Sequence, residues 1–185
     1  MGSNLLGIKE RCHSKELDAY GTSKIFKRRS DKISFYRNII TYLGFVVPLV
    51  VGAGVLAFSA GFLAYVFIPA GILMTIQLAL SLWTMVAQWD SKYSYAIGSM
   101  QNNLKMSGAW KTLGENPPPN AEEKFKELLA EELRQEQSDL TQSITDADIR
   151  YGMRMSLYQH RETCVVCKIK PLTMKPGNCD TCGNF

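Results

Sequence analysis

Residues 38–89 have the sequence NIITYLGFVVPLVVGAGVLAFSAGFLAYVFIPAGILMTIQLALSLWTMVAQW, which contains no Asp, Glu, Lys or Arg. A bilayer core accepts about 20 apolar residues per helix, so this stretch is long enough for two crossings. Nine Lys and Arg and four Asp and Glu precede it, and twelve and thirteen follow it. The whole-chain mean hydropathy of −0.08 hides this segregation. We therefore predict a mainly α-helical protein built around a membrane hairpin of two transmembrane helices.

A basic segment comes before the apolar stretch. Residues 1–37 mix apolar and charged side chains and predict a cytoplasmic amphipathic helix from about Ser14. By the positive-inside rule, its basic cluster places the N-terminus in the cytoplasm, and it can also contact anionic lipid headgroups. We expect no cleaved signal peptide, because no short apolar core lies near Met1. The membrane-proximal cluster consists of Lys27, Arg28, Arg29, Lys32 and Arg37.

The first span is predicted over residues 39–61, with a bend near Pro48. Ala53, Ala57 and Gly61 recur every four residues, and small side chains at this spacing let two helices approach closely. The partner of this small-residue face is either the second span of the same hairpin or another copy of the protein.

A polar stripe marks the second span. The turn before it is predicted within residues 59–68, with Pro69 in the first turn of the second helix. Because this turn carries no charge, both termini are predicted in the cytoplasm. Polar groups are costly in hydrocarbon, so the stripe either bonds within the hairpin or between copies, or lines an oligomeric pore. Its members lie on one helix face: Gln77, Ser81, Thr84 and Gln88.

Cytoplasmic helices are predicted after the hairpin. The second span is expected to continue as a helix over residues 90–116. Residues 117–160 begin with a proline break, and Asn120 is expected to cap an acidic helix. The exposed face of that helix is either solvated or paired with the basic N-terminal helix. A further helix is expected from Thr145, with Asp148 at the capping-box position.

Residues 161–185 contain two CxxC pairs separated by eleven residues, made by Cys164, Cys167, Cys179 and Cys182. Four thiolates at this spacing favour a tetrahedral structural zinc ion in a small ribbon or knuckle. Such a site has no open coordination position, so we predict a role in folding or docking. Two disulfides are the competing use of these cysteines, but they need an oxidising compartment.

No catalytic constellation is evident elsewhere in the sequence. Cys12, His13 and His160 form no metal-binding spacing, and no nucleophile occurs together with a base and an orienting group. We therefore predict that the protein is not an enzyme. The lysines around the cysteines lack aromatic stacking partners, so nucleic-acid binding is not favoured.

The CxxCx(11)CxxC spacing, residues 150–154 (RYGMR) and residues 182–185 (CGNF) resemble the small bacterial membrane proteins of mobile elements named for this cysteine pattern. The arrangement of a helix, two spans and long following helices resembles the SLATT class of two-span effectors, which is associated with nucleotide-signalling defence systems. The resemblance implies a homo-oligomeric effector that permeabilises the bacterial inner membrane in abortive infection, under an upstream sensor protein or nucleotide signal. The alternative is a membrane-anchored adaptor whose zinc module recruits a cytoplasmic partner.

Overall fold

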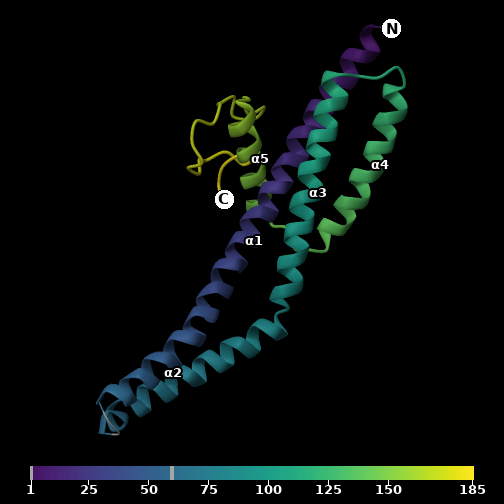
Figure 1. Ribbon diagram of the computed structural model, residues 1–185. Helices are drawn as coiled ribbons and strands as arrows, with labels where there is room; N and C mark the ends of the chain where they lie inside the picture. Colours follow the sequence, from purple (N-terminus) through teal and green to yellow (C-terminus); the bar gives the residue numbers. More distant parts are fainter. Residues whose placement is uncertain (1, 59–60) are drawn as a thin grey trace. The chain divides into compact units, whose positions relative to one another are not determined.

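The computed structural model describes residues 2–58 and 61–185, which form five α-helices and no strand (Figure 1). Two compact units are present. The hairpin unit is Arg29–Tyr95, and the helical unit comprises the chain up to Arg28 and from Ala96 onward. The mainly helical prediction is confirmed. The helices are α1 (Gly2–Phe58), α2 (Gly61–Val86), α3 (Trp89–Glu115), α4 (Ala121–Leu140) and α5 (Asp146–His160).

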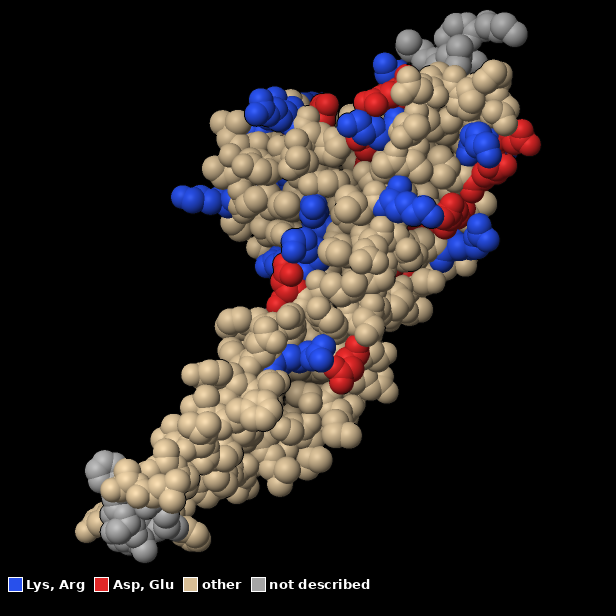
Figure 2. Space-filling view, viewed as in Figure 1, with Lys and Arg blue, Asp and Glu red and all other residues tan. Residues whose placement is uncertain are grey.

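In the hairpin unit, α2 runs back alongside the second part of α1 (Figure 1). A stretch within α1 and the segment Phe67–Val86 are each long and apolar enough to cross a membrane. Large apolar side chains point outward on both helices, for example Phe45 (74 % exposed) and Met85 (75 % exposed). The visible face of this unit is almost free of charged atoms (Figure 2).

The break between α1 and α2 falls inside the range predicted for the turn. α1 ends at Phe58 and α2 begins at Gly61, and residues 59–60 themselves are outside the described part of the chain. Pro69 is therefore inside α2 and not in its first turn. Gly61 begins α2, so it does not share a helix with Ala53 and the four-residue repeat is interrupted.

The two ends of the hairpin also differ from the prediction. α1 begins at Gly2, before Ser14, and continues without a break past residue 37, where a boundary was predicted. The second span does not continue directly into the next helix. α2 ends at Val86, and Gln88 has a φ of 54°, a left-handed conformation that interrupts regular helix geometry before α3 begins.

The helical unit has its core where α1, α3 and α4 meet. Trp110 of α3 is fully buried and its ring centroid lies 5.0 Å from that of Phe125 on α4. Arg11 of α1 also contacts this cluster, with its guanidinium 4.2 Å from the Phe125 ring centre. The core residues are Ile8, Cys12, Ala19, Met106, Trp110, Leu113, Ala121 and Phe125.

Helix α5 packs against α1 through two glycines. A Cβ on Gly21 would lie 2.9 Å from the Gly152 carbonyl oxygen, and a Cβ on Gly152 would lie 2.9 Å from that of Gly21. Ser156 reinforces the crossing by donating a hydrogen bond of 2.6 Å to the Leu17 carbonyl. The predicted capping box of Thr145 and Asp148 at the start of α5 is confirmed.

Asn120 precedes α4 as predicted, but its side chain makes no cap to the helix backbone. Its amide instead donates to the Glu123 carboxylate at 3.2 Å. The acidic helix does meet the basic N-terminal helix: Lys15 Nζ lies 3.0 Å from Glu132 Oε2.

Candidate functional site

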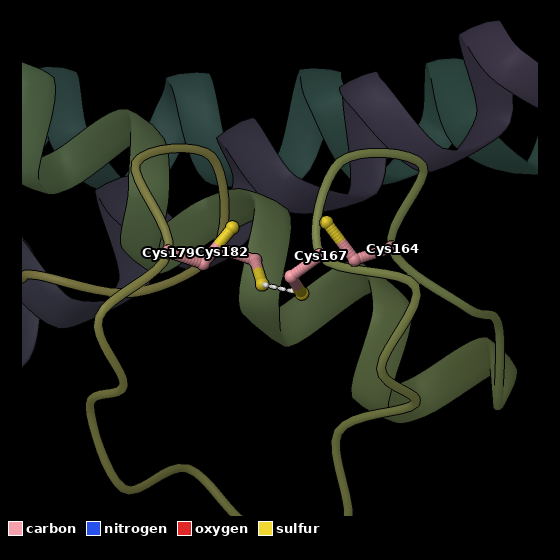
Figure 3. Close-up of side chains that lie close together, drawn as sticks. All are labelled: Cys164, Cys167, Cys179 and Cys182. Atoms are coloured by element: carbon pink, nitrogen blue, oxygen red, sulfur yellow. Dashed lines mark hydrogen bonds between the residues drawn. The ribbon is translucent and has the colours of Figure 1, made fainter.

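The four CxxC cysteines come together at the C-terminus, and their sulfur atoms all lie within 4.8 Å of one another (Figure 3). Cys164 and Cys167 come from one loop, and Cys179 and Cys182 face them from a second loop (Figure 3). Tetrahedral zinc with Zn–S bonds of about 2.3 Å requires sulfur–sulfur separations of about 3.8 Å. The Sγ atoms of Cys167 and Cys182 are 3.8 Å apart. The donor set therefore fits one structural metal ion such as zinc.

Each cysteine pair sits in a turn of the same design. The Lys168 N–H donates to the Cys164 carbonyl at 2.9 Å, and the Gly183 N–H donates to the Cys179 carbonyl at 2.8 Å. A Cβ on Gly183 would meet the backbone of Gly177, with the carbonyl carbon at 2.6 Å. The second turn therefore requires glycine at this position. These turns have no strands, so the site is a knuckle and not a ribbon within the described residues.

Backbone hydrogen-bond donors and burial shift the pKa values of two of the thiols in opposite directions. The Thr181 N–H lies 3.4 Å from Cys179 Sγ, and this hydrogen bond is the largest cause that lowers the pKa of Cys179 to about 6. Burial raises the pKa of Cys182 to about 12. Metal binding requires deprotonated thiols, so a metal ion that binds these cysteines would release protons.

The cysteine module, defined as residues 161–185, is attached to α5 by polar and apolar contacts. Leu157 is buried with Cys164 and Cys182. Arg154 Nε donates to the Thr173 carbonyl at 3.1 Å, and Arg150 Nε donates to the Asn184 carbonyl at 3.0 Å. A bound metal would therefore fix the end of α5 through both loops.

The polar stripe on α2 is directed toward α1 over most of its length. Gln77, Ser81 and Thr84 are half-buried, whereas most other residues of α2 are exposed. Gln77 Nε2 is 2.7 Å from the place of a Cβ on Gly44 of α1. Thr84 donates its hydroxyl to the Ser81 carbonyl at 2.7 Å. Gln88 is exposed at the break after α2 and is not part of the half-buried face.

The predicted small-residue face is not the half-buried face of α1. Ala53 and Ala57 are exposed, and for Gly61 only the backbone is described. The described half-buried residues between positions 41 and 57 are Gly44, Val46, Val47, Val51 and Gly54.

The basic residues that were predicted to lie near the membrane make different contacts. Arg28 lies over the Tyr151 ring, with its guanidinium 4.5 Å from the ring centre. Arg37 forms an ion pair of 2.9 Å with Asp90 in the hairpin unit. Lys27 and Lys32 are exposed and Arg29 is half-buried.

A buried polar network between α3 and α4 was not predicted. Asp139 is 3 % exposed, and its carboxylate accepts from Ser99 Oγ at 2.6 Å and Asn103 Nδ2 at 2.9 Å. Gln135 donates to the same carboxylate at 2.9 Å. The signal was present in the sequence: Ser99 and Asn103, and likewise Gln135 and Asp139, are four residues apart on one helix face.

A cavity of about 320 Å³ lies beside this network, between α1, α3, α4 and α5. Its charged lining consists of four carboxylates and one lysine: Asp18, Glu132, Glu136, Asp139 and Lys15. Burial raises the pKa of Asp18 and also that of Glu132, and the neighbouring carboxylates add to both shifts. This cavity is therefore unfavourable for an anion.

Two histidines also meet in space although the sequence shows no motif. Glu16 places one carboxylate oxygen 3.3 Å from His13 Nδ1 and the other 3.6 Å from His160 Nδ1. Tyr20 packs edge-on against His160, with ring centroids 5.2 Å apart. This contact joins α1 to the end of α5, just before the cysteine module.

Comparison with protein families gives a match over most of the chain. The family model described as "Mobilome CxxCx(11)CxxC protein" matches residues 9–185. Neither the curated proteins nor the solved structures contain a significant match to the chain.

Proposed function

The chain belongs to the mobilome CxxCx(11)CxxC protein family, and we propose that it is a membrane effector that assembles into oligomers and permeabilises the bacterial inner membrane in antiphage defence. In this proposal the hairpin unit spans the bilayer as two transmembrane helices, and both termini lie in the cytoplasm. The observation that carries it is the combination of an apolar exterior and a half-buried polar stripe in one hairpin.

The surface of the hairpin supports insertion into lipid. Apolar side chains as large as Leu49 (70 % exposed) are turned outward, and each fully exposed side chain of this kind costs about 1.5–3 kcal/mol in water. At the base of the hairpin, Arg37 pairs with Asp90, and the rings of Tyr36 and Trp89 lie 6.1 Å apart. Charged groups and aromatic rings at this level are typical of a membrane–water interface.

The packing of the polar stripe supports a resting state in which the hairpin is closed and forms no pore. Gln77 lies against Gly44 and Thr84 is bonded to its own helix, so Gln77, Ser81 and Thr84 are only partly open to lipid, whereas Gln88 is exposed. To form a pore, the helices would separate along this face, and the polar side chains of several copies would surround water instead. Assembly would thus exchange contacts within one hairpin for contacts between copies.

The activating signal is proposed to arrive through a sensor protein. A nucleotide carries phosphate groups, and the cavity of the helical unit presents mainly carboxylates to any ligand there. A protein contact on the helical unit avoids this repulsion. Zinc in the cysteine module would act as a structural cross-link and supply no reaction, so the proposed activity requires no catalysis.

Induced expression in bacteria carrying a membrane-potential dye tests the proposal. We expect depolarisation and growth arrest upon phage challenge with the wild-type chain. The double variant Ser81→Leu/Thr84→Leu should insert but retain the potential, whereas Leu78→Ile on the exposed face of α2 should behave as wild type. The pore mechanism would be ruled out if cells with inserted wild-type protein kept their membrane potential and grew normally in the presence of the cognate trigger.

The adaptor hypothesis is the second candidate, and the outward-facing apolar residues of the cysteine module favour it. Val165 is 76 % exposed and Leu172 is 78 % exposed, as expected for a surface that binds a protein. In an adaptor, the Ser81→Leu/Thr84→Leu variant would keep full biological activity because the hairpin serves only as an anchor.

A further inference from the structure

We propose that the cysteine module of one copy docks into a groove between α3 and α4 of a second copy, and that this contact joins the protomers. The inference rests on the proposed assembly and names its interface. Two surfaces of the helical unit carry it: an apolar, basic surface on the module and an apolar groove with an acidic rim on the two helices.

The module surface combines apolar side chains with positive charge. Val165, Val166, Ile169 and Leu172 are each at least 60 % exposed. Lys168 and Lys170 stand among them and are exposed. Residues 163–178 contain no Asp or Glu, so the charge of these lysines is not neutralised locally. Figure 2 shows positive side chains on the lobe formed by the module.

The groove lies between the end of α3 and the start of α4 and has a volume of about 540 Å³. Its apolar lining comes from Ala109, Leu113, Pro118 and Leu128. This lining offers a place to bury the apolar tips of the module, which is favourable by about 25 cal/mol per Å².

The rim of the groove carries the complementary charge. Glu127 and Glu131 line it one helical turn apart, together with Lys124. Lys124 Nζ lies 2.6 Å from Glu127 Oε2, so this lysine is held by its own helix. Glu131 makes no ion pair within the part of the chain that the structure describes. Two module lysines therefore meet a rim with a net negative charge, which fixes the orientation of the contact.

The module cannot fill the groove of its own chain. It is attached to α5, which packs on α1 through Gly21 and Gly152, whereas the groove is formed by α3 and α4. Within the helical unit, α5 and the module lie on one side of α1, and α4 lies on the other side (Figure 1). The contact is therefore between different surfaces of two copies, and such a head-to-tail contact continues until a ring closes.

Charge reversal in the full-length protein tests the contact. One variant carries Lys168→Glu/Lys170→Glu and the other carries Glu127→Lys/Glu131→Lys. We expect each variant alone to lose assembly in detergent at a concentration at which the wild type is oligomeric. A mixture of the two should assemble again, because each module then faces an oppositely charged groove. Lys9→Glu, an exposed charge reversal outside both surfaces, should leave assembly unchanged.

Zinc content and helicity must match the wild type for the module variant to be interpreted. If they do not, a photo-crosslinking amino acid at position 172 of the otherwise unchanged chain gives the answer, and we expect cross-links to α3 or α4 of another copy. Cross-links only to lipid or to other proteins would overturn the proposal. So would wild-type assembly of both charge variants, but that result would leave the membrane effector function standing. A wild-type chain that stays monomeric in every condition would contradict both.

Discussion

Gln77 Nε2 lies 2.7 Å from the position that a Cβ on Gly44 would occupy. Because Gly44 has no side chain, α1 can pack closely over the polar stripe of α2 at this point. A small side chain could be accommodated, because the contacting atom is at the end of a flexible side chain. A large one would push the two helices apart, since overpacking typically costs about 1–3 kcal/mol.

Gly44→Leu should therefore loosen the resting hairpin and raise the basal leak of the membrane without a trigger. Gly52→Leu is the matched control on the same helix, because nothing lies within 4 Å of a Cβ added there. Dye uptake by uninfected cells, at equal protein levels in the membrane, measures the difference. Equal leak from both variants would show that Gly44 does not hold the stripe closed.

Gly21→Ala should destabilise the helical unit by about 1–3 kcal/mol, because its methyl group would collide with the backbone of Gly152. Gly98→Ala, at an open position inside α3, should instead stabilise by up to about 1 kcal/mol. Thermal unfolding of the full chain in detergent measures both. A Gly21→Ala variant as stable as Gly98→Ala would contradict the close crossing of α1 and α5.

The wild-type chain should bind one zinc ion, and Cys179→Ser should abolish zinc binding. Cys12→Ala should still bind zinc, because Cys12 lies in the separate core of α1 and α3. Zinc removal should also expose Leu157 and release residues 150–185 to faster amide hydrogen exchange. Elemental analysis together with hydrogen exchange measures both effects. Two disulfides in protein isolated from bacterial membranes, with free thiols blocked at lysis, would rule out the metal centre.

Acid should weaken the contact of α5 with α1. Burial lowers the pKa of His160 below its ordinary value, although Glu16 partly opposes this shift. The folded chain therefore binds fewer protons at this residue than the unfolded chain, so stability is full above the unfolded pKa and falls as the pH drops below about 6.5. His160→Gln should show a smaller loss of melting temperature between about pH 7 and about pH 5. An unchanged slope would exclude His160 as a source of this dependence.

The helical class and the four-cysteine cluster could be predicted because both depend on local patterns. A long run without charge predicts apolar helices, and two CxxC pairs predict a four-cysteine cluster. Neither prediction depends on how the rest of the chain folds. The break at Gln88 could not be predicted, since this residue continues the helical spacing of the stripe and shows its left-handed φ only in three dimensions. From the sequence, Gly21 lowers the predicted helix propensity of its segment. In the structure it lies inside α1, at the point where α5 crosses closely.

Contacts between distant helices limited the prediction of the remaining sites. The partners Ser99 and Asp139 lie 40 residues apart, and only the pairing of α3 with α4 brings them within 2.6 Å. His13 and His160 likewise meet through the α1–α5 crossing, with ring centroids 6.5 Å apart. Spacing within one helix shows that such residues share a face, but it does not show which face of another helix they meet.

Leakage from liposomes tests the central claim most directly. Zinc-loaded full-length protein would be reconstituted into vesicles of bacterial lipids that contain a self-quenched dye, and protease protection would confirm that the hairpin is inserted. Because the wild-type hairpin is closed without its trigger, the protein used carries Gly44→Leu, and the wild type serves as the closed control. We predict dye release from the Gly44→Leu protein that rises more steeply than linearly with protein density, and that is lost when Ser81→Leu/Thr84→Leu is added. Complete retention of the dye at every density, with inserted and folded protein that forms oligomers, would contradict the account.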